Sequence, residues 1–220
     1  MKPTFKAQPV QVQVPASSAN LGPGFDCLGL ALNMNDRYMA QVMDEPGVDI
    51  DVTGEGAESI PTADKNLVIK AMYKGFDFLG GRPRGISLRQ LNVIPHGRGL
   101  GSSAAAIVGG LALSRALVLG GNERMSNEDM LNIANEMEGH PDNVSAAIYG
   151  SANLAWQESQ RGHVVAQSLN FDVDPRIGVL AFVPSSELST SKARKMLPES
   201  IPHSEAVRNS SNVAVLVQAL

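Results

Sequence analysis

Hydrophobic and polar residues alternate with a period of two at two places in the first quarter of the chain. The stretch "VQVQV" begins at residue 10 and "VDIDV" at residue 48. This period is typical of a strand with one buried face, so it predicts strands over 10–14 and 48–52. Pro15 is expected to end the first strand. Residues 16–26, "ASSANLGPGFD", are expected to form a loop because Ser, Gly, Pro and Asn favour turns.

A period of three to four residues predicts the helices. Residues 66–79 place hydrophobic side chains on one helical face and are followed by two glycines, which end helices readily. A helix from Ser126 is supported by Asp129 three positions on, an approximate capping box, and ends at Gly139. The remaining expected elements are helices over 102–119, 142–150 and 189–197, the last closed by Pro198, and strands over 86–93, 152–156, 163–169 and 177–183.

Strands and helices mix here without the strict alternation of a doubly wound parallel sheet. The sequence therefore predicts an α+β fold. A domain boundary is expected near 160–175, although "QESQRGH" at 157–163 resembles a hairpin turn more than a linker.

Composition narrows the class of partner. The chain has 220 residues, 43% of them hydrophobic, and a formal net charge of −4, which weighs against a nucleic acid or an anionic membrane as partner.

The single cysteine, Cys27, allows no internal disulfide and favours a reducing compartment, and its apolar surroundings favour a core role. Residues 1–20 show no signal-peptide pattern, and Ser102–Leu119, the most apolar window, suits a buried helix better than a membrane span. A cytoplasmic protein is expected.

The most specific local pattern is "PHGRGLGSSAA", residues 95–105. It lacks the lysine of the nucleotide-triphosphatase loop and the third glycine of the dinucleotide loop. A glycine-rich turn from a strand into a helix nevertheless offers unpaired amide groups to a phosphate. A serine hydroxyl there suits Mg²⁺. The alternative is a tight turn in which Ser102 caps the helix.

This stretch resembles the P-x-x-x-G-L-G-S-S-x-A motif of the GHMP kinases, in which the loop wraps the phosphates of ATP. Three further stretches are similar to the homoserine kinases of that family: "VPASSANLGPGFDCLGLAL" at 14–32, "EGHPDNVSAAIYG" at 138–150 and "STSKARKMLP" at 189–198. The resemblance implies phosphorylation of the L-homoserine hydroxyl, with ATP and Mg²⁺ as cofactors. It also implies two domains. Residues 1–165 would form an N-terminal domain like domain 2 of ribosomal protein S5, and 166–220 would begin a ferredoxin-like C-terminal domain.

Site residues follow from the same resemblance. Ser103 and Glu138 would hold Mg²⁺, with Glu136 close enough in sequence to be the alternative. The L-homoserine site would comprise Asn20, Asp26, His140, Asn143, Thr190 and Arg194. The ATP site would comprise Asn66 at the base and, along the loop, Pro95, His96, Gly97, Arg98, Gly99, Leu100, Gly101, Ser102, Ser103, Ala104 and Ala105.

Several alternatives stay open on sequence alone. Asp142 would be a catalytic base, or transfer would be direct with Asn143 orienting the hydroxyl. Asn20 would open a turn, Asp142 and Thr190 would cap helices, and Arg194 and Glu138 would be surface charges. A different GHMP kinase, acting on an isoprenoid or a sugar alcohol, and an ATP-binding chain without catalysis are the competing functions.

The C-terminal residues form an apolar helical stripe of Val213, Leu216, Val217 and Leu220, with no capping residue after it. The resemblance implies a longer protein whose third motif and second substrate arginine lie beyond this point. We therefore expect a C-terminally truncated form with little kinase activity. The resemblance leaves a homodimer open.

Overall fold

A strongly curved sheet forms one layer of the molecule. The computed structural model describes residues 2–160, 162–183 and 194–220. The strand order is β3-β4-β2-β5-β6, with β1 paired to β2, and every pairing except β3 with β4 is antiparallel. The strands are β1 (Val10–Ala19), β2 (Leu28–Met43), β3 (Gly47–Gly54), β4 (Gly85–Asn92), β5 (Ala152–Gln160) and β6 (His163–Phe171).

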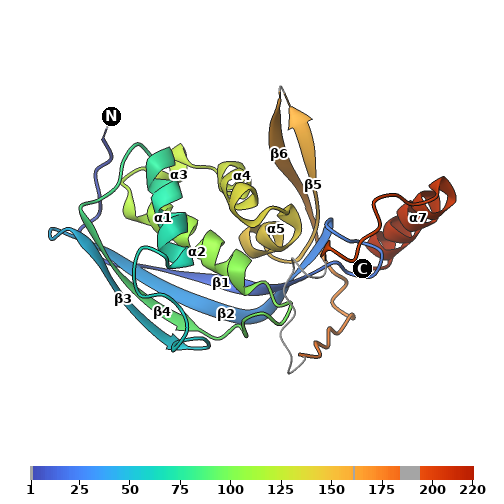
Figure 1. The fold of residues 1–220 in the computed structure, drawn as a ribbon, viewed down its shortest axis with the longest axis horizontal. Coiled ribbons are helices and arrows are strands. Elements are labelled where there is room, and N and C mark those ends of the chain that lie inside the picture. Colours follow the sequence, from blue (N-terminus) through green and yellow to red (C-terminus); the bar gives the residue numbers. More distant parts are fainter. Residues whose placement is uncertain (1, 161, 184–193) are drawn as a thin grey trace.

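Helices α1 to α5 cover one face of this sheet (Figure 1). The core lies between them and the sheet, around fully buried side chains such as Met72, Phe76 and Leu111. Helix α7 lies apart from this layer, beside the loop that joins β1 to β2 (Figure 1). The helices are α1 (Leu67–Phe78), α2 (Ser102–Leu117), α3 (Gly121–Arg124), α4 (Asn127–Glu138), α5 (Pro141–Tyr149) and α7 (His203–Ala219).

The prediction that β1 ends at Pro15 is wrong. The pairing of β1 with β2 shifts register between Pro15 and Ala16 and then continues to Ala19. Proline has no N–H to donate, so it is tolerated at such an irregularity, and the ladder resumes beyond it. The loop is therefore confined to residues 20–27, and Ser17 belongs to a strand.

The long strand β2 was not predicted. Its C-terminal half alternates buried and exposed residues, but its N-terminal half, "LGLALN", is covered on more than one side and shows no period of two. Leu28–Leu30 pair with β5, and two of these residues, Gly29 and Leu30, also pair with β1. The missing period therefore follows from tertiary pairing that local sequence does not encode.

The C-terminal part of the chain differs most from expectation. The β5–β6 hairpin is confirmed, and both strands extend beyond the predicted ranges. The strand predicted at 177–183 is wrong, because these residues pair with no strand in the described structure and expose Leu180 and Phe182 by 78% and 88%. Residues 189–193 of the helix expected at 189–197 lie outside the described residues.

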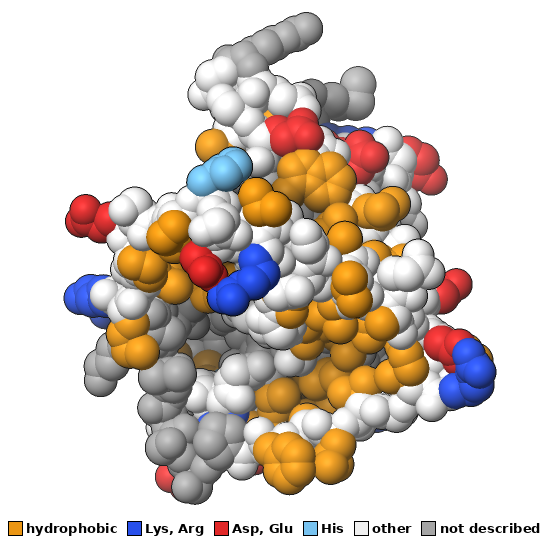
Figure 2. Space-filling model, turned by 90° about the vertical axis from the view of Figure 1, so that its right-hand side faces the viewer, with side chains coloured by type: hydrophobic (Ala, Val, Ile, Leu, Met, Phe, Trp, Pro, Cys, Tyr) orange, Lys and Arg blue, Asp and Glu red, His pale blue; other side chains and the backbone are white. Residues whose placement is uncertain are grey.

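Helix α7 has the predicted apolar stripe in half-buried positions. Leu216 lies against Gly22, and the Asn209 amide donates to the Pro23 carbonyl, so α7 contacts the β1–β2 loop. Figure 2 views the molecule from the side on which α7 lies in Figure 1, and hydrophobic side chains gather on this face. Val207 and Val215 of α7 are among the exposed ones. Of the helices in the described residues, none is long and apolar enough to cross a membrane.

Candidate active site

The glycine-rich loop joins the end of β4 to the start of α2. Gly97, Gly99 and Gly101 have φ of 65°, 73° and 69°, the left-handed region that glycine adopts without strain. Gly101 is the N-cap of α2, so the alternative in which Ser102 caps the helix is wrong. No side chain of the described residues caps this helix end, so its first amide groups are available to an anion.

The buried carboxylate of Asp36 fixes the backbone just before this loop. Asp36 accepts hydrogen bonds from the N–H groups of Val93 and Ile94 at 2.6 and 2.9 Å and from the Tyr38 hydroxyl at 2.9 Å. Burial, together with the Asp36 carboxylate, raises the pKa of Tyr38 far above its usual range, so the phenol stays protonated and donates. The role of Asp36 could not be predicted from the sequence, because the backbone N–H groups that it accepts from lie more than fifty residues away.

The three loop glycines are not equivalent. A Cβ added at Gly99 would meet no atom of the described residues within 4 Å, whereas one at Gly101 would lie 2.1 Å from the Ser17 hydroxyl oxygen and 3.1 Å from the Asn143 amide nitrogen. Gly99 thus opens onto free space where a phosphate could approach the backbone. Gly101 instead allows the loop to pack closely on β1 and α5.

A cavity of about 250 Å³ adjoins the first turn of α2. Its lining includes Asn66, Gln90, His96 and Ser103, together with apolar side chains such as Leu67 and Ala106. Its contact with the loop and its mainly apolar wall suit a nucleotide base.

Asn66 occupies this cavity wall with its polar atoms already engaged. Its Oδ1 accepts from the N–H groups of Val68 and Ile69 at the start of α1, and its Nδ2 donates to the Pro61 carbonyl. It also exchanges hydrogen bonds with Gln90. The side chain therefore caps α1 and shapes the cavity wall.

Ser103 and Glu138 lie together beside the loop. The Ser103 hydroxyl donates to Glu138 Oε1 at 2.5 Å, which connects the first turn of α2 to the last turn of α4. Glu136 is exposed and forms no hydrogen bond to Ser103. A hydroxyl and a carboxylate oxygen are donors that suit Mg²⁺, so the chemistry of this pair fits the ion.

A second group of charges forms where the β1–β2 loop meets residue 194. Arg194 pairs with Asp26 through two hydrogen bonds of 2.8 and 2.6 Å, and its guanidinium lies 5.6 Å from the centre of the Phe25 ring. Asp26 has a φ of 56°, and its N–H donates to Asn20 Oδ1 at 2.8 Å. Asn20 therefore orders the turn that presents Asp26, and Arg194 is a paired, half-buried side chain.

His140 and Asp142 adjoin this group at the start of α5. His140 Nδ1 lies 2.6 Å from Asp142 Oδ1, and the Asp142 side chain is 0% exposed. The hydrogen bond to Asp142 raises the pKa of His140, outweighing the opposite effect of burial. The N-cap of α5 is His140, so the alternative in which Asp142 caps the helix is wrong.

One carboxylate oxygen of Asp142 has no hydrogen-bond partner among the described residues. Its Oδ1 accepts from the Asn143 N–H, whereas its buried Oδ2 has no partner among the described residues. One ligand atom each of Asp26, His140 and Asp142 lies within 4.8 Å of the others. This concentration of negative charge, bordered by Arg194, suits a ligand that carries both a cationic and an anionic group.

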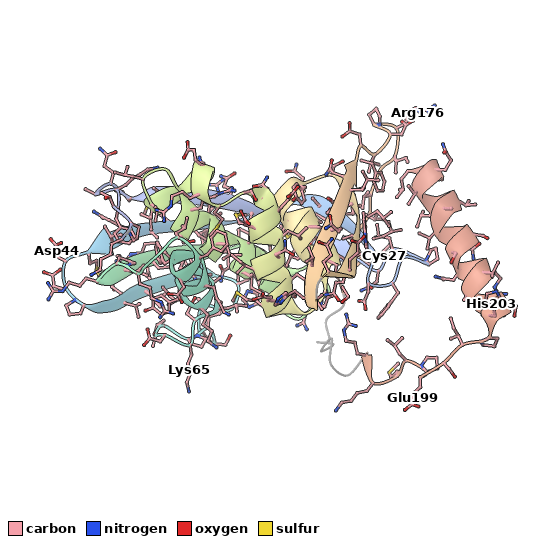
Figure 3. The ribbon with its side chains drawn as sticks, turned by 90° about the horizontal axis from the view of Figure 1, so that it is seen from above. Cys27, Asp44, Lys65, Arg176, Glu199 and His203 are labelled. Carbon is pink, nitrogen blue, oxygen red and sulfur yellow. The ribbon has the colours of Figure 1, made fainter. Side chains whose placement is uncertain are left out.

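Asn143 lies between the two halves of the site. Its Nδ2 donates to the Ser17 hydroxyl at 3.0 Å, and Ser17 N–H donates to the Leu100 carbonyl at 3.1 Å. Figure 3 shows Cys27 between the main body and α7, and Lys65, which lines the cavity, well away from it. Ser17 was not among the residues predicted from the sequence, and Thr190 lies outside the described residues.

Three comparisons agree with this arrangement. Residues 66–151 match the family model described as the GHMP kinases N-terminal domain. The homoserine kinases of Streptomyces coelicolor and Streptomyces avermitilis are 45% and 44% identical over 99% of this chain, which covers 69% and 70% of their lengths. The crystal structure of homoserine kinase from Cytophaga hutchinsonii is 31% identical, with a TM-score of 0.76 over 99% of this chain and 68% of that one.

The fold and its glycine loop define the chain as a kinase of the GHMP class, as the α+β prediction and the loop motif anticipated. Within that class the chain belongs to the homoserine kinase family. The resemblance noted from the sequence is confirmed.

Proposed function

We propose that the chain transfers the γ-phosphoryl group of ATP to the side-chain hydroxyl of L-homoserine, giving O-phospho-L-homoserine and ADP in the cytoplasm, as a step of threonine biosynthesis. The observation that carries the proposal is the Asp26–Arg194 pair, held at 2.6 Å beside half-buried His140 and its buried partner Asp142. A carboxylate and a guanidinium side by side match the ammonium and carboxylate of an amino acid. A neutral sugar alcohol or an isoprenoid alcohol offers neither charge.

The nucleotide would occupy the cavity by Asn66, with its phosphates along residues 95–105. Gly99 gives the phosphates access to the backbone, and the free amide groups of the first turn of α2 favour negative charge. Ser103 and Glu138 would hold Mg²⁺, which, when bound, neutralises charge on the transferred phosphoryl group.

The substrate would enter between Asp26 and Arg194, replacing their mutual ion pair. Asp26 would then pair with the α-ammonium and Arg194 with the α-carboxylate. The single ion pair is half exposed, so separating it costs little compared with a buried pair. His140 would contact the polar groups of the substrate, and Asp142 holds its imidazole in place.

We infer direct transfer, with Asn143 orienting the hydroxyl. Asp142 is fully buried, and Oδ1 is engaged by His140 and by the Asn143 N–H, which suits a structural carboxylate better than a proton acceptor. The hydroxyl oxygen forms its bond to the γ-phosphorus as the bond to the ADP oxygen breaks, and the hydroxyl proton leaves to a phosphoryl oxygen or to solvent. Because the transition state of phosphoryl transfer is loose, catalysis depends mainly on positioning the reacting groups and stabilising their charge.

A coupled assay of ADP release tests the proposal. L-homoserine should stimulate release, whereas 4-hydroxybutyrate, which lacks the α-ammonium, and mevalonate should not. Stimulation by mevalonate alone would assign the chain to another GHMP kinase. ATP binding without stimulation by any alcohol would support an ATP-binding chain without catalysis.

A further inference from the structure

We propose that Ser17 is a positioning residue, which directs the side-chain amide of Asn143 toward the hydroxyl that is phosphorylated. The inference rests on the proposed function, because it concerns how Asn143 orients that hydroxyl. Ser17 lies on β1 and is 0% exposed, so it contacts other residues of the chain and reaches no ligand directly.

The first observation is the direction of the amide. Asn143 Nδ2 lies 3.0 Å from the Ser17 hydroxyl oxygen and 3.4 Å from the Ser17 carbonyl oxygen. The two ends of an amide are nearly equal in shape, so its neighbours decide which end faces them. A carbonyl oxygen only accepts hydrogen bonds. Ser17 therefore selects the NH₂ end of Asn143 and turns Oδ1 away.

The second observation is that Oδ1 is left available. Within the described part of the chain, Asn143 Oδ1 accepts no hydrogen bond, and the side chain is only half-buried. A carbonyl oxygen facing the site can accept the proton of the substrate hydroxyl. That hydrogen bond points a lone pair of the hydroxyl oxygen toward the γ-phosphorus without removing the proton beforehand.

The third observation is that Ser17 also contacts the phosphate loop. Its N–H donates to the Leu100 carbonyl at 3.1 Å, and its hydroxyl oxygen occupies the space that a Cβ at Gly101 would need. One residue thus fixes both Asn143 and the loop that receives the phosphates. This matters because a misplacement of about 1 Å between reacting groups can cost on the order of a hundredfold in rate.

The test is a double-mutant cycle in kcat. Ser17→Ala removes the hydroxyl and keeps the backbone bond to Leu100, so kcat should fall about tenfold while the KM for ATP changes less than about twofold. In an Asn143→Ala background, Ser17→Ala should change kcat less than about twofold, because Ser17 acts through Asn143. An equal tenfold loss in both backgrounds would overturn the inference.

Ser18→Ala is the matched control. Ser18 is half-buried on the same strand, and its side chain forms no hydrogen bond within the described residues. Its removal should leave kcat unchanged, and urea unfolding should report intact folds for all variants. If Ser17→Ala does not fold, Ser17→Cys keeps the volume, weakens the acceptor and should give the same ranking.

A measurement without turnover separates this inference from the proposed function. In ¹⁵N NMR spectra of the unliganded chain, the side-chain NH₂ of Asn143 should exchange slowly with solvent, and Ser17→Ala should accelerate that exchange about tenfold. Unchanged exchange would remove the structural basis of the inference even if L-homoserine is phosphorylated. Accelerated exchange in a chain that phosphorylates no amino acid would instead count against the proposed function and, with it, against the role of Ser17.

Discussion

At the residue scale, the site consists of paired side chains, and every pair except His140–Asp142 joins separate elements. Ser103 pairs with Glu138, Asp26 with Arg194, His140 with Asp142, and Asn143 with Ser17. The glycine loop and the three flanking motifs could be predicted because each is a contiguous stretch. Ser17 and Asp36 could not, because their roles arise from contacts 126 and 57 residues away along the chain.

The glycine loop gives the first prediction. Gly99→Ala places a methyl group in the open space by the loop and should weaken ATP binding about tenfold or more, with a stability loss of about 1 kcal/mol from the positive φ. Gly101→Ala should cost more stability, because its Cβ would lie 2.1 Å from the Ser17 hydroxyl oxygen. Calorimetric titration with ATP and urea unfolding measure the two effects. Normal ATP affinity in Gly99→Ala would contradict the phosphate role.

The proposed metal pair gives the second prediction. Glu138→Gln should lower kcat by about 10²–10³, because a charge that acts in the transition state is lost. The matched control is Glu136→Gln, two residues away and exposed, which should change kcat less than about twofold. Turnover measured across a Mg²⁺ titration checks both variants. The reverse ranking would place the metal on Glu136.

At the element scale, helix boundaries and the strands β3 to β6 followed from local patterns, whereas the end of β1 and the course of β2 did not. Asn66 caps α1, and Ser126 and Asp129 form the predicted capping box of α4, which ends at Gly139. These interactions span a few residues, so the sequence displays them. The course of β2 and the absence of a strand at 177–183 depend on which strands are available as partners, and local patterns do not carry that information.

The start of α5 gives the third prediction, on stability against pH. The pKa of His140 is raised mainly by its hydrogen bond to Asp142, with smaller contributions from the charges of Asp142 and Glu138, while burial and Arg194 oppose the rise. The folded chain therefore binds this proton more tightly than the unfolded chain. The stabilisation is complete below the ordinary histidine pKa of about 6.5 and is lost as pH rises through the folded-state value.

Urea unfolding at a series of pH values measures this contribution. The free energy of unfolding of the wild type should fall from pH 6 to pH 8.5 relative to that of His140→Gln, which lacks the titrating group. His163→Gln, a substitution at an exposed position on β6, is the matched control and should leave the wild-type pH dependence unchanged. Parallel curves for wild type and His140→Gln would contradict the assignment.

At the scale of the whole molecule, the chain spans 69–70% of the length of the two Streptomyces homoserine kinases. We propose that residues 1–165 form the ATP-binding domain and 166–220 belong to a second domain, in agreement with the many exposed hydrophobic side chains between Leu169 and Val215.

The fourth prediction follows from this length. A form extended by the remaining third of a homoserine kinase relative should turn over L-homoserine at least about tenfold faster than the 220 residues, because the resemblance implies a second arginine there for the substrate carboxylate. ATP affinity should change less. Equal turnover of the two forms would show that residues 1–220 contain every group the reaction requires.

The most direct test of the account identifies the product. The chain is incubated with ATP, Mg²⁺ and L-homoserine, and ³¹P NMR follows the phosphorus signal. We predict a phosphomonoester signal coupled to the two protons of the side-chain CH₂–O group. In Arg194→Leu, the KM for L-homoserine should rise about tenfold or more, while the KM for ATP stays unchanged. ATP hydrolysis without this phosphomonoester would contradict the proposed function. An equal rise in the KM for L-homoserine and the KM for ATP in Arg194→Leu would contradict it too.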